Sequence, residues 1–364
     1  MNAITEQQSL AHWPLSPEQR AVLVAAETSE SDTQQAASAQ ANVMVADIQG
    51  ALDSSRLERA LSDLRQQHEV LATALKSVAG YRGLRHQALE ELPAIEWRYE
   101  DLRGSDDKAN GVRDYSEALK LRPMAVESGE LLRPALLRTG ETTWMLVLAV
   151  SALVADRGSL QSLFSELADA YDQSGGADDE SALQYSQFIE WRASLENDAD
   201  AEEGREYWQN HQQHAKQAGV CRLPARQVNR HDVRVEHEYV TYPLGPDLVE
   251  RIDSLADELQ VSAEAVLQAA WWALLVRISS NEWVLGGWQH DCRQDYEVMQ
   301  GSIGLFDKVL PVLVEGVADS EFSSWITRLA EQLEAHTQAQ EYWPIGALPD
   351  KRHLAAGFAF SEGV

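Results

Sequence analysis

One short turn in this chain collects three side chains that could do chemistry: Ser151, Asp156 and Arg157. A hydroxyl can act as a nucleophile, a carboxylate can accept a proton, and a guanidinium can bind an anion. No G-x-S-x-G sequence surrounds Ser151, so the strained elbow that exposes the nucleophile of serine hydrolases is not encoded here. We therefore expect Ser151 not to be a nucleophile, and for Asp156 we favour a structural ion pair over base catalysis.

The elements that must position this turn are a strand before it and a helix after it. Residues 144–150 form the most apolar run in the chain, without polar alternation and too short to cross a membrane. This run predicts a strand buried on both faces. After the turn, Leu160, Leu163 and Leu167 recur at helical spacing, and Ser159 can cap that helix. Many α/β enzymes hold their chemistry where a buried strand feeds a helix.

Strand and helix patterns alternate in both halves of the chain, which predicts an α/β fold. Residues 134–138 and 142–150 predict a hairpin, and the Ser-Pro pair predicts a helix that opens at Pro17. Further on, Ser262 caps a helix whose apolar positions cover more than half of its circumference, so we expect it to be nearly engulfed. Residues 233–242 predict another strand.

The length of 364 residues allows two lobes, each with its own core. We expect the domain boundary in a polar connector over residues 217–232. It would separate an N-terminal lobe of residues 1–216 from a C-terminal lobe of residues 233–364.

Composition excludes several classes of protein. The net charge of −28 would repel phosphate backbones and anionic lipid, so we expect no nucleic-acid partner and no membrane partner. Cys221 and Cys292 are too few for a disulfide framework or a cysteine-rich metal site. Residues 1–20 lack the apolar core of a signal peptide, which predicts a cytoplasmic location.

Three further histidine patterns have both a chemical and a structural interpretation. In His290-Asp291-Cys292, the histidine and cysteine would share one face of a strand, but we favour no reactive or metal-binding role. His211 and His214, at i and i+3, could hold a metal, yet no third ligand is evident, so we expect a solvated helix face and no metal site. His68 lies on the apolar side of a helix and is expected to be a hydrogen-bonded structural histidine.

Six patches spread over nearly the whole chain carry a family resemblance. They are 16–20 (Ser-Pro-Glu-Gln-Arg), 67–73 (Gln-His-Glu-Val-Leu-Ala-Thr), 151–157 (Ser-Ala-Leu-Val-Ala-Asp-Arg), 185–191 (Tyr-Ser-Gln-Phe-Ile-Glu-Trp), 283–293, and 303–311 (Ile-Gly-Leu-Phe-Asp-Lys-Val-Leu-Pro). Five of them resemble, in order, the S-x-A-Q-x-R, R-H-E-x-L-R-T, H-H-x-x-x-D-G, Y-x-D-F-A-x-W and I-G-x-F-V-N-T-L-P motifs of nonribosomal peptide synthetase condensation domains. Residues 283–293 resemble the strand-and-arginine segment of the second lobe. Each patch is weak alone, but their shared order makes the resemblance strong.

The resemblance implies a fold and partners. Condensation domains belong to the chloramphenicol-acetyltransferase-like superfamily, so we expect two pseudosymmetric α/β lobes in a V with a central tunnel. Phosphopantetheine arms of carrier proteins enter such a tunnel from opposite faces, and no resident cofactor is expected. A carrier protein and an adjacent adenylation domain are the implied partners. The C-terminal lobe is expected to be incomplete relative to the family.

Departures from the motifs bear on function. The second histidine of the family motif, which assists attack of the acceptor amine, is Ala152 here, and the first is Ser151. A methyl group cannot take a proton, so general acid–base help worth roughly 10²–10⁴ in rate should be lost. Arg157 replaces the motif's glycine, and Lys308 replaces the asparagine of the later motif. With Ser151 and Ala152, these two residues are the expected tunnel lining.

The resemblance also implies a structural salt bridge between Asp156 and Arg293, both of which are retained. A buried carboxylate needs such a partner to stay ionised at tolerable cost. The salt-bridge residues are retained, whereas the histidine that would act as the base is replaced. This combination favours a degenerate, non-catalytic domain that serves as a platform for other synthetase domains. The first alternative is an active acyltransferase that joins a carrier-bound acyl thioester to an amine by positioning alone. The second is a small-molecule or acyl-chain binding module without turnover, in which the tunnel is kept.

Overall fold

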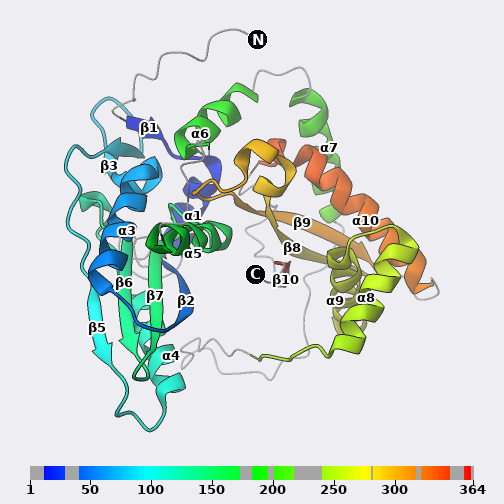
Figure 1. Cartoon of the computed structure of the whole chain (residues 1–364). Helices are drawn as coiled ribbons and strands as arrows, with labels where there is room; N and C mark the ends of the chain where they lie inside the picture. The colour runs from blue at the N-terminus through cyan, green and yellow to red at the C-terminus, as the bar shows by residue number, and fades with distance from the viewer. Residues whose placement is uncertain are drawn as a thin grey trace, which may run out of the picture. The chain divides into compact units, whose positions relative to one another are not determined.

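Figure 1 shows the computed structural model of the chain. The residues that the structure describes are 12–28, 41–172, 183–195, 201–216, 240–279, 282–316, 321–344 and 356–361. The predicted connector over 217–232 and most of the predicted strand over 233–242 lie outside them. The packed residues form two compact units, Met1–Ser194 with Asp291–Asp307, and Leu195–His290 with Lys308–Val364. Both units combine helices with sheet, so the predicted α/β class is confirmed.

The larger sheet of the first unit holds the strand that leads into the turn. Its four strands are, in spatial order, β2 (Ala41–Gln49), β7 (Thr143–Ser151), β6 (Leu132–Arg138) and β5 (Arg98–Asp101). Strand β7 is antiparallel to both neighbours, and Val150 lies opposite Asn42 on β2 and Leu132 on β6. The predicted hairpin is therefore confirmed. Burial on both faces holds from Leu146 to Ser151, whereas Trp144 and Met145 are half-buried.

A smaller antiparallel sheet and the first helix belong to the same unit. The sheet's spatial order is β1 (His12–Pro14), β4 (Leu84–Ala88) and β3 (Thr73–Ser77). Helix α1 (Pro17–Thr28) opens at the predicted proline. Ser16 Oγ accepts a hydrogen bond from the Gln19 amide at 3.1 Å, and Gln19 Oε1 accepts one from the Ser16 amide at 2.9 Å. This reciprocal capping box satisfies two backbone donors at the helix start.

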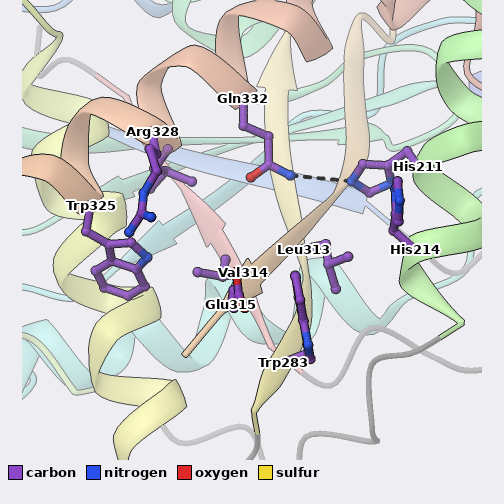
Figure 2. Close-up of a pocket in the computed structure, with 10 residues that line it drawn as sticks. His211, His214, Trp283, Leu313, Val314, Glu315, Trp325, Arg328 and Gln332 are labelled. Atoms are coloured by element: carbon purple, nitrogen blue, oxygen red, sulfur yellow. Dashed lines mark hydrogen bonds between the residues drawn. The ribbon is translucent and has the colours of Figure 1, made fainter. Parts of the chain in front are cut away.

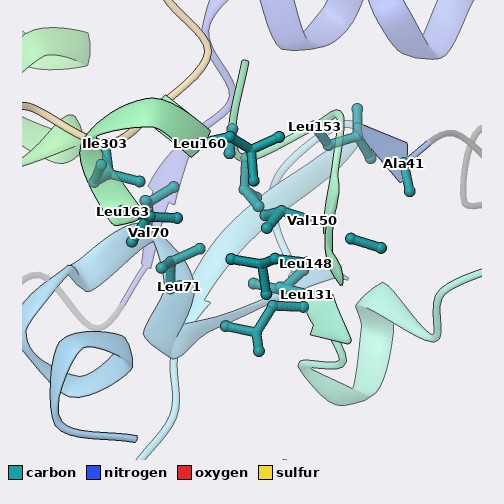
Figure 3. Packing of buried hydrophobic residues seen from close by; sticks show 14 of the residues in the cluster. Ala41, Val70, Leu71, Leu131, Leu148, Val150, Leu153, Leu160, Leu163 and Ile303 are labelled. Carbon is teal, nitrogen blue, oxygen red and sulfur yellow. The ribbon is translucent and has the colours of Figure 1, made fainter. Parts of the chain in front are cut away.

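The remaining helices of the first unit cover its core. They are α3 (Ser54–Gln67), α4 (Lys108–Leu121), α5 (Arg157–Asp172) and α6 (Tyr185–Ser194), with 3₁₀ turns η1 (Glu69–Ala72), η2 (Val126–Ser128), η4 (Cys292–Asp295) and η5 (Glu297–Met299). In Figure 3, Leu148 and Val150 of β7 meet Leu160 and Leu163 of α5 in one buried cluster, to which Ile303 also belongs. Residues 291–307 therefore pack into the first unit although they follow the start of the second.

The second unit has its own sheet and core. Its three strands are, in spatial order, β10 (Gly357–Ala359), β8 (Trp283–Asp291) and β9 (Asp307–Glu315), and β10 is parallel to β8. Its helices are α7 (Ala201–Ala215), α8 (Pro246–Leu259), α9 (Ala263–Ser279) and α10 (Phe322–Ala339), followed by the 3₁₀ turn η6 (Gln340–Tyr342). Helix α10 packs on both α7 and α9.

Helix α9 is only partly as predicted. Ser262 caps it, since its Oγ accepts a hydrogen bond from the Ala265 amide at 3.1 Å. Trp272 is fully buried, but Leu274 and Ile278 are 51% and 41% exposed, so the expectation of near-complete engulfment is wrong. An apolar residue shows that a helix face is hydrophobic, yet the number of neighbours that cover it is set by tertiary packing.

Helix α7 belongs with the second unit because it packs on α10 and η6. The lobe boundaries at 216 and 233 stay a prediction.

Among the described residues, no single helix has the length and apolar character of a membrane span. Helices α8 and α9 reach that length and apolar character only when taken together, and the chain bends by 103° between them.

Candidate functional site

The turn after β7 is closed by its own backbone around Ser151. This residue is fully buried; its amide donates to Leu131 O at 2.8 Å, and its carbonyl accepts from the amides of Val154 and Ala155 at 2.9 and 3.1 Å. Among the residues that the structure describes, the only contact of its Oγ is a long one, as acceptor for the Leu153 amide at 3.4 Å. Among the described residues no base contacts this hydroxyl, and a serine nucleophile needs such a base to activate it.

Ala152 is half-buried, and its methyl side chain offers no atom that can exchange a proton. An imidazole linked to this turn belongs to His86 on β4. Gln19 connects them, since its Nε2 donates to Leu153 O at 2.6 Å and contacts His86 Nε2 at 2.9 Å. The other ring nitrogen, His86 Nδ1, lies 3.1 Å from Thr73 Oγ1. Both nitrogens are therefore engaged, and burial lowers the pKa of His86 to about 3, which favours a neutral ring with a structural role.

Asp156 is a saturated acceptor. Its Oδ1 accepts from the Ser159 amide at 2.8 Å and from Arg293 Nη2 at 2.6 Å, and its Oδ2 accepts from the amides of Phe306 and Asp307 at 2.7 and 3.1 Å. The carboxylate is 1% exposed. The cap of α5 is thus Asp156, and the expectation that Ser159 caps this helix is wrong. With four donors on two oxygens, the side chain has no capacity left to accept a substrate proton.

Ser159 has a different task, because its hydroxyl ties α5 to the segment before β9. Its Oγ donates to Gly304 O at 2.7 Å and accepts from the Gly304 amide at 3.0 Å and from Arg293 Nη1 at 2.9 Å. A Cβ on Gly158 would lie 2.2 Å from Arg293 Nη2, so the close approach of the guanidinium requires glycine there.

Arg293 sits among three acids, and sequence reasoning identified only one of them as its partner. Its Nε donates to Asp291 Oδ1 at 2.9 Å and its Nη2 to Asp291 Oδ2 at 2.8 Å. Burial opposes its charge, but Asp156 and Asp291 outweigh that effect and raise the pKa of Arg293 above the ordinary arginine value. Carboxylate oxygens of Asp156, Asp291 and Asp307 lie within 4.8 Å of one another, a spacing that could suit a metal ion. The guanidinium already supplies the cation at this position.

The other predicted tunnel residues differ in environment. Arg157 is exposed at the start of α5. Lys308 belongs to the second unit, where its Nζ donates to Glu341 Oε1 at 2.8 Å and both side chains are buried. Whether Ser151, Ala152, Arg157 and Lys308 line one passage stays a prediction.

The histidines weighed from the sequence have structural neighbours. His68 Nε2 contacts Glu166 Oε2 of α5 at 2.6 Å, which fits the hydrogen-bonded role expected for it. His290 is buried, and its ring centroid lies 4.6 Å from that of Trp288. Strand β8 ends at Asp291, so alternation does not extend to Cys292, which begins η4. Asp291 turns instead to Arg293.

His211 and His214 line a pocket of about 350 Å³ in the second unit (Figure 2). Gln332 Nε2 of α10 contacts His211 Nε2 at 3.4 Å. His336, also on α10, stacks edge-on against His211 with ring centroids 4.8 Å apart, and no local sequence signal could have paired them. Burial lowers the pKa of His211 to about 4 and that of His336 to about 3. Among the described residues these rings form no three-ligand cluster.

Comparisons with known proteins show which family and which solved structures this chain is similar to. A family model described as "Condensation domain" matches residues 9–355. Tyrocidine synthase 3 of Brevibacillus parabrevis is 24% identical over 306 residues, which cover 84% of this chain and 4% of that protein. A probable non-canonical nonribosomal peptide synthetase, CymA, of Salinispora arenicola is 28% identical over 315 residues, again 4% of its length. The chain thus spans a small fraction of the relatives it matches.

Solved structures agree in fold. The first condensation domain of the CDA synthetase superposes with a TM-score of 0.74 at 18% identity and covers 92% of this chain and 77% of its own. The X-domain from teicoplanin biosynthesis gives a TM-score of 0.71 at 22% identity, with 98% and 78% covered. The fold is therefore the chloramphenicol-acetyltransferase-like fold of condensation domains. Because the family model matches nearly the whole sequence, this chain belongs to the condensation domain family.

Proposed function

We propose that this condensation domain no longer catalyses amide formation and acts as a binding platform for carrier, adenylation or tailoring proteins of a nonribosomal peptide synthetase. The observation that carries the proposal is Ala152, a methyl group at the position where the family motif has its histidine. The neighbouring hydroxyl of Ser151 is buried and has no base among the described residues, and Asp156 is fully occupied. None of these three side chains can therefore take a proton from an amine.

The hydrogen-bond network around Asp156 supports a retained function rather than a domain that has lost all function. Asp156, Ser159 and Arg293 connect the turn, helix α5 and the 302–307 segment through charge-assisted hydrogen bonds. Such a network is costly to bury, and it would not be needed in a chain that had lost all function. It holds the same surfaces in place whether or not chemistry occurs beside it.

The comparisons support partner binding in a general way. The synthetases that resemble this chain are far longer than it is, which favours neighbouring domains as partners. A solved structure of a domain of the same fold shows the complex of the X-domain and OxyB from teicoplanin biosynthesis. A condensation-type fold can therefore serve as one half of a protein–protein complex. A phosphopantetheine arm would reach this domain only as part of a bound carrier protein, and the cytoplasmic location stays a prediction.

The test is a single-turnover assay with an acyl-carrier donor and an aminoacyl-carrier acceptor. We expect no amide product above the rate without protein, and we expect a carrier or adenylation domain to bind with a measurable Kd. Product formation at the rate of a histidine-containing condensation domain in the same assay would refute the proposal. Absence of both product and binding would refute the platform role.

The alternative function is amide formation by positioning alone. It is favoured by the half-buried state of Ala152, which keeps this position partly accessible, and orientation can supply several kcal/mol without a base. In that case the rate should rise with pH as the acceptor amine loses its proton, and it should show no second limb from a protein base. The third function, acyl-chain binding without turnover, predicts a thermal shift with acyl-pantetheine in the absence of any carrier.

A further inference from the structure

Five cationic side chains are buried in the described part of the chain, and one of them differs from the rest. Four have a carboxylate within 4 Å: Arg133 with Glu130, Arg192 with Glu18, Arg293 with Asp156, and Lys308 with Glu341. Arg65, which is 5% exposed, has no such partner among the described residues. Because a buried charge needs compensation, this exception calls for an explanation.

The contacts of Arg65 hold it in place but do not neutralise it. Its Nη1 donates to Pro93 O at 2.5 Å, its Nη2 to Gly129 O at 3.2 Å, and its Nε to Leu71 O at 3.4 Å. These three bonds leave two of the five guanidinium N–H groups without an acceptor in the described structure. Carbonyl dipoles and the negative end of α3 offset part of the charge. Burial nevertheless lowers the pKa of Arg65, as expected for a cation without a counter-ion.

Arg65 also lines a pocket of about 420 Å³ in the first unit. Ser62, Arg65 and Gln66 stand at i, i+3 and i+4 on α3 and so share one face of the helix. The other lining residues come from η1 and the segment after β4: Ala72, Leu89, Glu90, Leu92, Pro93, Ala94 and Ile95. Helix α3 thus contributes a cation, an amide and a hydroxyl to the lining, and most of the other lining residues have apolar side chains.

We propose that this pocket binds a small molecule through an oxyanion, a carboxylate or a phosphate group, which pairs with Arg65. The free N–H groups of the guanidinium match the two oxygens of such a group, and Gln66 and Ser62 add donors beside it. The apolar part of the ligand packs on Leu89 and Leu92. The pocket's volume falls within the range typical of small-metabolite sites.

Glu90 lines the same pocket from an exposed position and makes no ion pair with Arg65. Its carboxylate lowers the local affinity for an anion by like-charge repulsion. Neutralisation of Glu90 should therefore strengthen binding. If Glu90 were instead the partner of Arg65, the same change would weaken the protein and leave anion binding absent.

Thermal unfolding of the full chain tests the site with two probes, inorganic phosphate and butyrate, which separate the two oxyanion sources. Each titration is matched at constant ionic strength with sodium chloride, because a protein of net charge −28 is stabilised by any screening salt. We expect at least one probe to raise Tm saturably, by about 2 °C at ten times its Kd.

Variants on α3 decide whether Arg65 is responsible. Arg65→Met should abolish the saturable shift, whereas Arg59→Met, the same charge change at an exposed position of the helix, should keep it. Arg65→Lys, chosen in case the methionine variant does not fold, should weaken binding about tenfold, and Glu90→Gln should strengthen it about threefold. A shift that persists in Arg65→Met or Arg65→Lys at full size, or no saturable shift with either probe, would overturn the proposal.

Discussion

Asp156 illustrates how a side chain that could do chemistry can be fully committed to structure. Its two oxygens serve the Ser159, Phe306 and Asp307 amides and Arg293 at once. Replacement by Asn removes the charge and at least one acceptor, and leaves Arg293 with Asp291 alone. We expect Asp156→Asn to lower the free energy of unfolding by about 3–5 kcal/mol in urea denaturation.

The matched control for this change is Asp101→Asn, because Asp101 pairs with Arg103 at the surface. Surface pairs contribute little, so this variant should unfold close to the wild type. Equal stability of the two variants would show that the Asp156–Arg293 pair does not contribute to the free energy of unfolding.

A second prediction at the scale of single residues concerns Gly158. A methyl group there would lie 2.2 Å from Arg293 Nη2, so Gly158→Ala should destabilise the protein by about 1–3 kcal/mol through displacement of the guanidinium. Gly111, within α4, is the control, since its added Cβ would meet Leu102 only at 3.4 Å. Gly111→Ala should therefore stabilise by about 0.5–1 kcal/mol, as in any helix interior. Shifts of the urea midpoint in the same direction for both variants would contradict the packing around Gly158.

At the scale of elements, Leu274 and Leu275 of α9 separate the observed helix face from the predicted one. Leu275 is buried in the core of the second unit, whereas Leu274 is half exposed. We expect Leu275→Ala to cost about 2–4 kcal/mol of unfolding free energy and Leu274→Ala less than about 0.5 kcal/mol. Equal losses in the two variants would favour the fully engulfed helix that the sequence pattern indicated.

His86 joins three elements, since it lies on β4 and contacts Thr73 of β3 and Gln19 of α1. Its pKa is about 3 in the folded protein and about 6.5 when unfolded, so the unfolded state binds more protons between these values. Stability is then lost as pH falls from 6.5 toward 3. Between pH 6 and pH 4, His86→Gln should reduce the slope of unfolding free energy against pH by about 1.4 kcal/mol per pH unit.

The slope is the decisive readout for His86, because the substitution also changes hydrogen bonds and shifts stability at every pH. Carboxylates titrate alike in both proteins, so their contribution cancels in the difference. Parallel curves for the variant and the wild type would mean that His86 is not buried as a neutral group.

Local patterns explain which elements were predictable. The β6–β7 hairpin, the helix that opens at Pro17 and the cap at Ser262 depend on residues a few positions apart, where periodicity and capping chemistry act. The contacts that were missed join distant segments. Arg293 and Ser159 are 134 residues apart, and so are Gln19 and Leu153. No spacing rule reports such a contact, which is why His86, His336 and Arg65 gave no signal before the fold was known. The Asp291–Arg293 contact is the exception, because these residues are two positions apart and the pairing was missed although it is local.

At the scale of the whole molecule, the family explains what the turn alone could not. The Asp156–Arg293 pair was expected from the resemblance to condensation domains, and the two side chains do meet at 2.6 Å. Under the proposed function, the reaction that this domain no longer catalyses is one between two carrier-bound substrates. The role of Ala152 is therefore best tested in the whole domain with both substrates present.

Ala152→His restores the imidazole in that setting. Ala152 is half-buried, so a larger side chain can be accommodated on its exposed side, and the Asp156–Arg293 pair that supports the turn is in place. We expect this variant to form amide at least tenfold faster than the wild type, within the roughly 10²–10⁴ that general acid–base catalysis supplies. The gain should follow deprotonation of an imidazole near its ordinary pKa, about 6.5. Ala152→Phe, which adds bulk without a base, is the control and should gain nothing. If both variants stay at the uncatalysed rate while remaining folded, the domain has lost more than its base, and the changes at Arg157 and Lys308 become the next residues to revert.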